Sequence, residues 1–220
     1  MNMKHLKWVA LAATTIVTAT CLTGCGTTAG YQQADKTGAS IAQFREEIAK
    51  AKLAVDDTVK SLGEVAVTAD TNPRAAFQRY SKSLANLEST AAKAKSRAAE
   101  MKAAGQAYFA TWEKELAQLK NPEIKNLAMQ QRAKLQATFD SIKTVAEPLK
   151  AQFDPWLSDL QDMQKYLSND LTISGVDAAK PLFAKTQKEG FEVQKSMDAL
   201  VAELNTVAAT LTPANVPAKK

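Results

Sequence analysis

Residues 77–119 read FQRYSKSLANLESTAAKAKSRAAEMKAAGQAYFATWEKELAQL, and this stretch decides the fold. Its apolar and small residues recur at alternating steps of three and four positions. An average period of about 3.5 residues is typical of helices that pack along a seam, so the stretch predicts one long helix. The seam positions are Phe77, Tyr80, Leu84, Leu87, Ala91, Ala94, Ala98, Met101, Gly105, Tyr108, Trp112 and Leu119, with a slip near Leu116.

Three further stretches carry the same period. They run from Ile41 to Ala69, from Ile124 to Leu167 and from Ala179 to Leu211. Thr71-Asn72-Pro73 and Asn121-Pro122 separate the first three stretches, and each asparagine can cap a helix whose first turn holds the proline. Ser168 to Gly175 is a polar stretch that predicts the third turn.

Four helices joined by short turns predict an all-α fold, either an elongated antiparallel four-helix bundle or long coiled-coil hairpins. We expect one domain over residues 41–211. The two middle helices should have about 46 residues each and a length of roughly 70 Å. The outer helices are shorter, so only two or three helices should pack in an overhanging section. An exposed seam there is compatible with homo-oligomerisation.

The third helix contains two prolines seven residues apart, in Glu147-Pro148 and Asp154-Pro155. Each removes a helical hydrogen bond, so the helix should bend or restart, with Asp154 as a cap. One interpretation is a widened section with an apolar pocket or partner surface at Phe153 and Trp156. The alternative, which we favour, is an ordinary kink with Trp156 in the core.

Two other features near the seam bear on binding. Tyr108 and Trp112 fall on the seam and should be core, whereas Phe109 lies off it and is a candidate exposed interaction residue. Ala91, Ala94 and Ala98 are small residues on the seam. They predict close helix packing in preference to a ligand groove.

Residues 1–25, MNMKHLKWVALAATTIVTATCLTGC, have a basic start and an apolar stretch too short to span a membrane. Their end, Leu22-Thr23-Gly24-Cys25, resembles the lipobox of bacterial lipoproteins. The resemblance implies a signal peptide over residues 1–24, cleavage before Cys25, and acylation of Cys25 by chains such as palmitate. Cys21 lacks an apolar residue three positions before it, so it is the weaker site. An ordinary signal peptide with a chance cysteine is the alternative.

The segments that flank the domain predict its location. Residues 25–40 are small and polar, which predicts a lipidated cysteine followed by a flexible tether, and residues 212–220 predict a disordered tail. Gly26, in place of Asp, resembles the pattern of lipoproteins sent to the outer membrane. For a Gram-negative source we therefore expect an anchor in the inner leaflet of that membrane, facing the periplasm.

The mature chain lacks the residues of several kinds of chemistry. His5, the only histidine, lies in the leader, and Cys25 carries the lipid. These facts argue against His-dependent nucleophilic catalysis and Cys or His metal sites. The net charge of +5 falls to +3 without Lys4 and Lys7, and the remaining charges are interspersed along the helices. We predict no catalytic residue, no metal, no cofactor and no nucleic-acid partner.

Nearly all of the mature chain is similar to a known family. The residues that carry the resemblance lie along the helix seams and beside them, and none of them indicates a chemistry: Tyr108-Phe109, Trp112, Glu115-Leu116, Asn121, Ile124, Leu127, Leu135 to Phe139, Glu147-Pro148-Leu149, Phe153, Trp156-Leu157, Leu160, Lys165-Tyr166-Leu167 and Asn169. They resemble the bacterial domain-of-unknown-function family numbered 2959, which pairs a lipobox-type leader with a long helical domain. The resemblance implies fold and location, and it carries no activity or site residue.

Two functions follow as hypotheses. The first is a membrane-anchored periplasmic lipoprotein with a structural, adaptor or protein-interaction role, whose helical faces engage a protein partner or a second copy. The alternative is a helical module that binds a small molecule or lipid in an apolar pocket near the kinked third helix. An enzyme is disfavoured by the missing residue types. Whether the bundle is solid or hollow near residues 145–160 separates the two main hypotheses.

Overall fold

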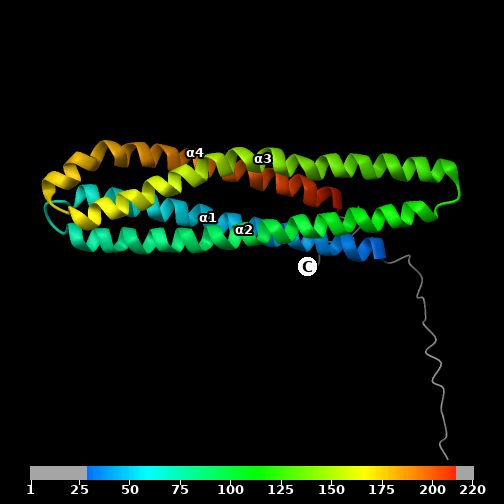
Figure 1. The fold of residues 1–220 in the computed structure, drawn as a ribbon, viewed down its shortest axis with the longest axis horizontal. Coiled ribbons are helices and arrows are strands. Elements are labelled where there is room, and N and C mark those ends of the chain that lie inside the picture. Colours follow the sequence, from blue (N-terminus) through cyan, green and yellow to red (C-terminus); the bar gives the residue numbers. More distant parts are fainter. Residues whose placement is uncertain (1–28, 212–220) are drawn as a thin grey trace, which may run out of the picture.

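The protein is described by a computed structural model over residues 29–211, and this range folds into four α-helices. Helix α1 spans Ala29–Val67, α2 spans Pro73–Gln118, α3 spans Pro122–Asn169 and α4 spans Ile173–Leu211. Each helix contacts its two neighbours, and no contact joins diagonal helices within the range described. Consecutive helices run in opposite directions along one long axis (Figure 1). The predicted all-α, elongated antiparallel four-helix bundle is therefore confirmed.

The predicted seams form the core over most of the bundle. Every predicted seam position of α1 from Ile41 to Val65 is buried, as is Ala69 in the turn that follows, and so is every one of α4 from Ala179 to Val207. In α2 and α3 the seam is buried only in part. Burial of these apolar faces supplies the main stabilisation, because the described chain holds no disulfide to add to it.

The two predicted asparagine caps are present. The Asn72 side chain accepts a hydrogen bond from the backbone N–H of Ala75 at 3.3 Å, and the Asn121 side chain accepts one from Glu123 at 2.9 Å. The prolines that follow them occupy the first turns of α2 and α3. The third turn is shorter than predicted: α4 begins at Ile173, because the Thr172 hydroxyl accepts the N–H of Gly175 at 3.1 Å.

Helix α1 begins earlier than predicted. The flexible tether expected over residues 25–40 is wrong from Ala29 onward, where the chain is helical. Thr37 is fully buried, and its hydroxyl lies 3.3 Å from the carbonyl oxygen of Ala104 on α2. Small polar side chains thus pack at this helix interface, where a hydropathy pattern gives no signal. The predicted leader, lipobox, Cys25 and tail lie outside the described residues.

Helix α3 is continuous through both of its internal prolines, Pro148 and Pro155. Its axis changes direction in the yellow-green section, as predicted for a bend (Figure 1). The alternative of a restart with Asp154 as a cap is wrong, because Asp154 lies inside the helix and its carboxylate pairs with Lys95 of α2 at 3.1 Å. The bend brings the last half of α3 toward α2, where the Tyr80 hydroxyl donates to the carbonyl of Leu160 at 2.6 Å.

The α2–α3 hairpin extends past the other two helices at one end of the bundle (Figure 1). The first turn of α1 lies beside Glu115, since a methyl group on Gly30 would be 3.4 Å from that carboxylate. Beyond this level, Ile124 and Leu127 are 53% and 58% exposed although they continue the α3 seam. The predicted overhang therefore exists. None of the described helices is long and apolar enough to cross a membrane.

Candidate functional site

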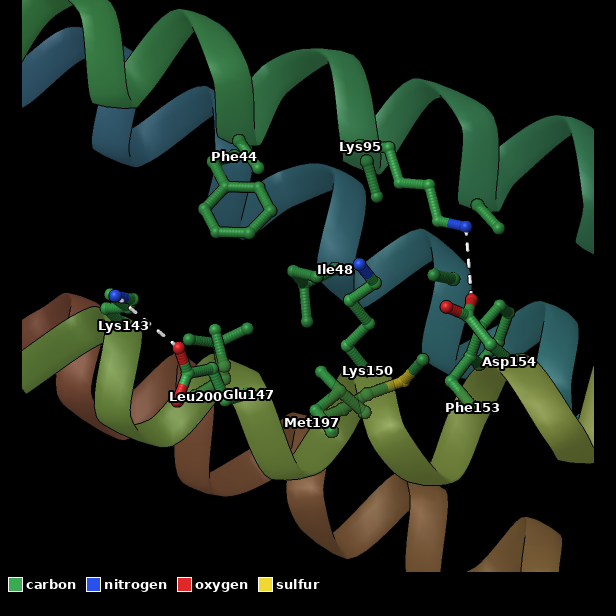
Figure 2. Close-up of a pocket in the computed structure, with 16 residues that line it drawn as sticks. Phe44, Ile48, Lys95, Lys143, Glu147, Lys150, Phe153, Asp154, Met197 and Leu200 are labelled. Carbon is green, nitrogen blue, oxygen red and sulfur yellow. Dashed lines mark hydrogen bonds and ion pairs between the residues drawn. The ribbon is translucent and has the colours of Figure 1, made fainter.

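The bundle is hollow beside the first proline of α3. A cavity of about 420 Å³ lies where all four helices contribute side chains (Figure 2). Its volume is within the range of about 300–1,000 Å³ that is usual for small-molecule sites. The apolar part of its wall is made by Phe44, Ile48, Ala51, Ala91, Ala94, Ala98, Ala146, Leu149, Phe153, Met197 and Leu200.

Small side chains account for the hollow. Ala91, Ala94 and Ala98 of α2 line the cavity and face the α3 segment that contains Pro148. The close packing predicted at these alanines is therefore not found on the side of α2 that faces α3, although Ala91 and Ala94 themselves are buried. Close packing of small residues requires the two backbones to approach each other, but the bend of α3 directs its approach to α2 toward Leu160 and leaves this section open.

Charged side chains rim the cavity. Lys95 and Asp154 form an ion pair of 3.1 Å between α2 and α3, and Lys143 pairs with Glu147 at 3.6 Å. Lys150 also belongs to the wall and has no ion-pair partner among the described residues. Figure 2 shows its ammonium group beside Ile48, over the apolar interior rather than directed away from it. Exposed ion pairs contribute at most about 1 kcal/mol each, so the two that rim the cavity can open readily.

The two predicted pocket residues of α3 have different places. Phe153 belongs to the cavity wall. Trp156 does not: it is 2% exposed, its ring centroid lies 5.9 Å from that of Phe153, and its indole N–H donates to the carbonyl of Thr186 at 2.9 Å. Trp156 as core is therefore confirmed. Trp156 supports the wall of the cavity from behind and closes the bundle next to it.

The third predicted interaction residue, Phe109, is buried. It is 5% exposed, so the expectation of an exposed residue off the seam is wrong. Its ring packs edge-on against Phe139 of α3 at 5.8 Å, and the Arg132 guanidinium lies 5.8 Å from its centre. The predicted seam has a period of about 3.5 residues, whereas a straight helix has 3.6 residues per turn. The buried face therefore continues from Gly105 to Phe109 instead of Tyr108, and Tyr108 is only partly buried.

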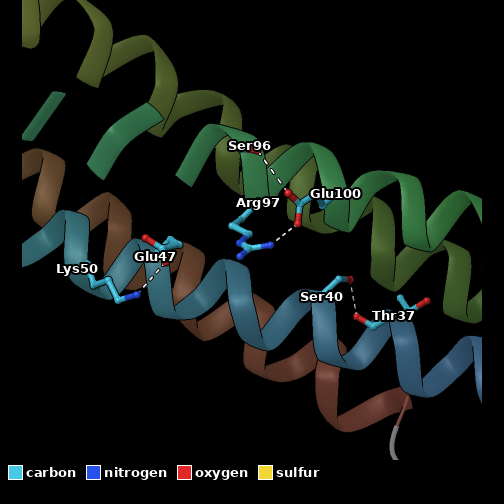
Figure 3. Close-up of polar contacts among 7 residues, drawn as sticks. All are labelled: Thr37, Ser40, Glu47, Lys50, Ser96, Arg97 and Glu100. Carbon is cyan, nitrogen blue, oxygen red and sulfur yellow. Dashed lines mark hydrogen bonds and ion pairs between the residues drawn. The ribbon is translucent and has the colours of Figure 1, made fainter. Parts of the chain in front are cut away.

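A second group of polar side chains lies on α1 and α2 (Figure 3). Glu47 pairs with Lys50 at 2.8 Å, and Arg97 pairs with Glu100 at 2.5 Å. The hydrogen bond from Lys50 is the main cause that lowers the pKa of Glu47 below its ordinary value. Each carboxylate already has its own cation, as expected of solvated helix faces. Within the helices described, no group of three or more His, Cys, Asp or Glu residues is suited to a metal ion.

The rim lysines were missed by the sequence reasoning. Lys143 and Lys150 are seven residues apart, which places them on one face of α3. They lie three residues before and four residues after Ala146, and Lys95 lies at the same spacings between Ala91 and Ala98 on the opposing helix. Basic residues directly beside small ones on two facing seams are a signal of an open, charged-rimmed section, but the facing pair has to be known before the signal can be read.

Comparison with known protein families gives a match over the whole described range. The sequence model of a family described as Protein of unknown function (DUF2959) matches residues 26–211. The match includes all four helices and the whole cavity wall. No curated protein and no solved structure shows significant similarity to the chain.

Proposed function

We propose, from the premise that this chain belongs to the DUF2959 family of proteins of unknown function, that it is a lipid-anchored envelope protein whose bundle binds a small amphipathic molecule. The ligand has an apolar body and a single acidic head group. The observation that carries the proposal is the cavity of about 420 Å³ between the four helices. The family membership agrees with the resemblance found in the sequence and brings no activity with it.

The apolar wall supports an apolar ligand body. Phe44, Ile48, Leu149, Phe153 and Met197 come from three different helices, so a ligand that fills the cavity would bury apolar surface against all of them. Burial of such surface is favourable by about 25 cal/mol per Å². Protein interiors are normally close-packed, and this section lacks packing contacts that the adjacent section around Trp156 has.

The rim supports an acidic head group. Three lysines and two carboxylates line the cavity, so its net charge is 3 − 2 = +1. The carboxylates are paired with Lys95 and Lys143, which leaves the Lys150 ammonium for the ligand. A carboxylate or phosphate at the mouth would meet a cation there, with the apolar body below it.

The anchor part of the proposal rests on the lipobox-like Leu22-Thr23-Gly24-Cys25 and on Gly26. We place the lipidated protein on the inner leaflet of the outer membrane, facing the periplasm. Mass spectrometry of the mature protein from cells tests this: cleavage before Cys25 with added acyl mass is expected. An intact leader, or an unmodified Cys25, would exclude the anchor.

Ligand binding is tested with two fluorescent probes, neutral 1-N-phenylnaphthylamine and anionic 8-anilinonaphthalene-1-sulfonate. Ala94→Phe fills the cavity and should abolish binding of both. Ala103→Phe makes the same change at an exposed position of α2 and should leave binding unchanged. Equal binding by the two variants and the wild-type protein would show that the probes do not enter the cavity.

The role of Lys150 is tested in the same assay. Lys150→Glu should weaken the anionic probe by an order of magnitude or more and leave the neutral probe within about twofold, since 1.4 kcal/mol corresponds to a tenfold change. Lys188→Glu, an exposed charge reversal on α4 away from the wall, is the matched control. If both reversals weaken the anionic probe alike, only the overall charge matters and the head-group assignment fails.

A structural or adaptor role is the second candidate function. It is favoured by large apolar side chains that are exposed on the neighbouring helices α1 and α4, namely Leu53 and Phe191. A protein partner or a second copy of the chain would dock on these long faces. Photo-crosslinkers placed at Leu53 and Phe191 in intact cells should then give a discrete adduct. If neither position gives an adduct and the protein stays monomeric, the role is excluded.

A further inference from the structure

The far end of the α2–α3 hairpin exposes four large apolar side chains. We call it the tip and define it by Leu119, Ile124, Leu127 and Met129. The last three are between 51% and 58% exposed, and Leu119 lies in the turn itself. Exposed apolar clusters of this kind are usually covered by a partner or a membrane.

The start of α1 and the end of α4 are both directed toward this same end of the bundle. The first turn of α1 lies beside Glu115, three residues before the last residue of α2. The tip therefore projects past the start of α1 by only the last three residues of α2, about 5 Å of helix, and by the loop that connects α2 to α3. Figure 1 shows the blue start of α1 and the red end of α4 both pointing toward the hairpin turn, with the other two turns at the opposite end.

The covalent chain limits how far the tip can be from an anchor. Cys25 and Ala29 are four residues apart, and a fully extended chain covers at most about 3.6 Å per residue. An acyl group on Cys25 therefore holds the start of α1 within roughly 14 Å of the bilayer surface. The opposite end of the bundle is about 70 Å away along α3, so the tip is the end that can reach the membrane.

The charges around the tip suit the same surface. Between residues 113 and 134 there are five basic and three acidic side chains, which gives a net charge of +2. Lys114 and Lys120 are exposed, and the carboxylate of Glu113 is already paired with Arg132 at 2.9 Å. Apolar side chains flanked by lysines are typical of segments that lie in the interface of an anionic bilayer.

We infer that the tip inserts its apolar side chains into the interface of the bilayer that carries the anchor, so that the protein holds the membrane at two points. The inference rests on the proposed acylation of Cys25. The lipid prevents dissociation, and the tip fixes the bundle with its long axis directed away from the surface. A single flexible attachment would leave that direction free.

The test uses the full lipoprotein, made with its own leader and reconstituted into vesicles of phosphatidylethanolamine and phosphatidylglycerol. Leu127→Cys carries a nitroxide at the tip. Thr71→Cys carries the same label in the exposed turn at the opposite end, as the matched control. Acylated Cys25 offers no thiol, so each variant takes one label. Collisions with oxygen, which concentrates in lipid, are compared with collisions with a water-soluble nickel chelate.

We expect the ratio of oxygen to nickel collisions at residue 127 to be several-fold higher than at residue 71. Equal ratios would overturn the inference. Shielding of residue 127 from both reagents would also overturn it, because a protein partner or a second copy would then cover the tip. Flotation with the vesicles tests the anchor separately: a protein that floats but has a water-exposed tip fails only this inference, whereas one that does not float fails the proposed acylation.

Discussion

The section around Trp156 and the end around Leu127 lie on the same helix and carry the same spacing of apolar residues, yet one is buried and the other is exposed. Trp156 is enclosed because α4 passes beside it and its indole N–H donates to Thr186. Leu127 is exposed because α4 ends at Leu211 and α1 begins at Ala29. Spacing determines which face of a helix could be buried, and the lengths of the neighbouring helices determine whether it is buried.

The largest expected difference comes from truncating the two side chains. Trp156→Ala removes a fully buried indole and its hydrogen bond, so it should lower the free energy of unfolding by about 3–5 kcal/mol. Leu127→Ala removes an exposed side chain and should change it by less than about 0.5 kcal/mol. Urea unfolding followed by circular dichroism measures both. Similar losses for the two variants would mean that the tip is packed in solution.

Two glycines differ in the space that an added methyl group would find around them. A methyl group on Gly190 would lie 2.8 Å from Val59 and 3.1 Å from Trp156, so Gly190→Ala should destabilise the protein by about 1–3 kcal/mol. Gly38 in α1 has no atom within 4 Å of the same position, so Gly38→Ala should stabilise by up to about 1 kcal/mol. Thermal unfolding of both variants gives the signs. A neutral Gly190→Ala would show that the section around Trp156 yields easily.

The two asparagine caps give a third, smaller contrast. Asn72→Ala and Asn121→Ala each remove a cap worth about 1 kcal/mol. Asn72 starts α2 at the four-helix end, so its loss should lower the global stability. Asn121 starts α3 at the tip, where the last turns can fray alone, so its loss should appear mainly as faster hydrogen exchange over residues 122–130. Equal global losses would contradict an independently fraying tip.

The smallest effect concerns acid. Hydrogen bonds from the Thr172 hydroxyl and backbone N–H lower the pKa of Asp170 below its ordinary value of 3.8. The stabilisation is therefore complete above pH 3.8 and is lost as the pH falls through the lower folded pKa. The stability difference between the wild-type protein and Asp170→Asn should shrink over that range in unfolding curves. A stability difference that stays constant as the pH falls through that range would contradict the role given to these hydrogen bonds.

The sequence predicted the helices well because the seam repeats over many turns and two Asn-Pro pairs mark the starts of α2 and α3. It misplaced the start of α1, because Gln33 and Thr37 bind the Ala104 carbonyl through polar atoms that a search for apolar residues ignores. It also misplaced Phe109, because a shift of one residue in the seam makes Phe109 the buried position in place of Tyr108.

The cavity was harder to predict than the helices. Alanines such as Ala94 occur both where helices touch and where they separate, so residue size alone does not distinguish a tight seam from a hollow one. The distance between α2 and α3 depends on where α3 bends, which is a property of several residues together. Pro148 and Pro155 correctly marked the section of α3 that bends. They did not indicate that a cavity lies beside Pro148 and that the core around Trp156 is filled.

The early start of α1 fixes the distance between the first turn of the helix and the cavity. Phe44, the first cavity residue, is fifteen residues from Ala29, or about 22 Å of rigid helix. In the proposed lipoprotein only three residues separate Cys25 from that helix, so the mouth of the cavity would lie about one α1 segment of this length from the membrane-proximal end of the bundle. A ligand of the proposed site would then have to reach the cavity at that distance, in the aqueous layer beside the membrane.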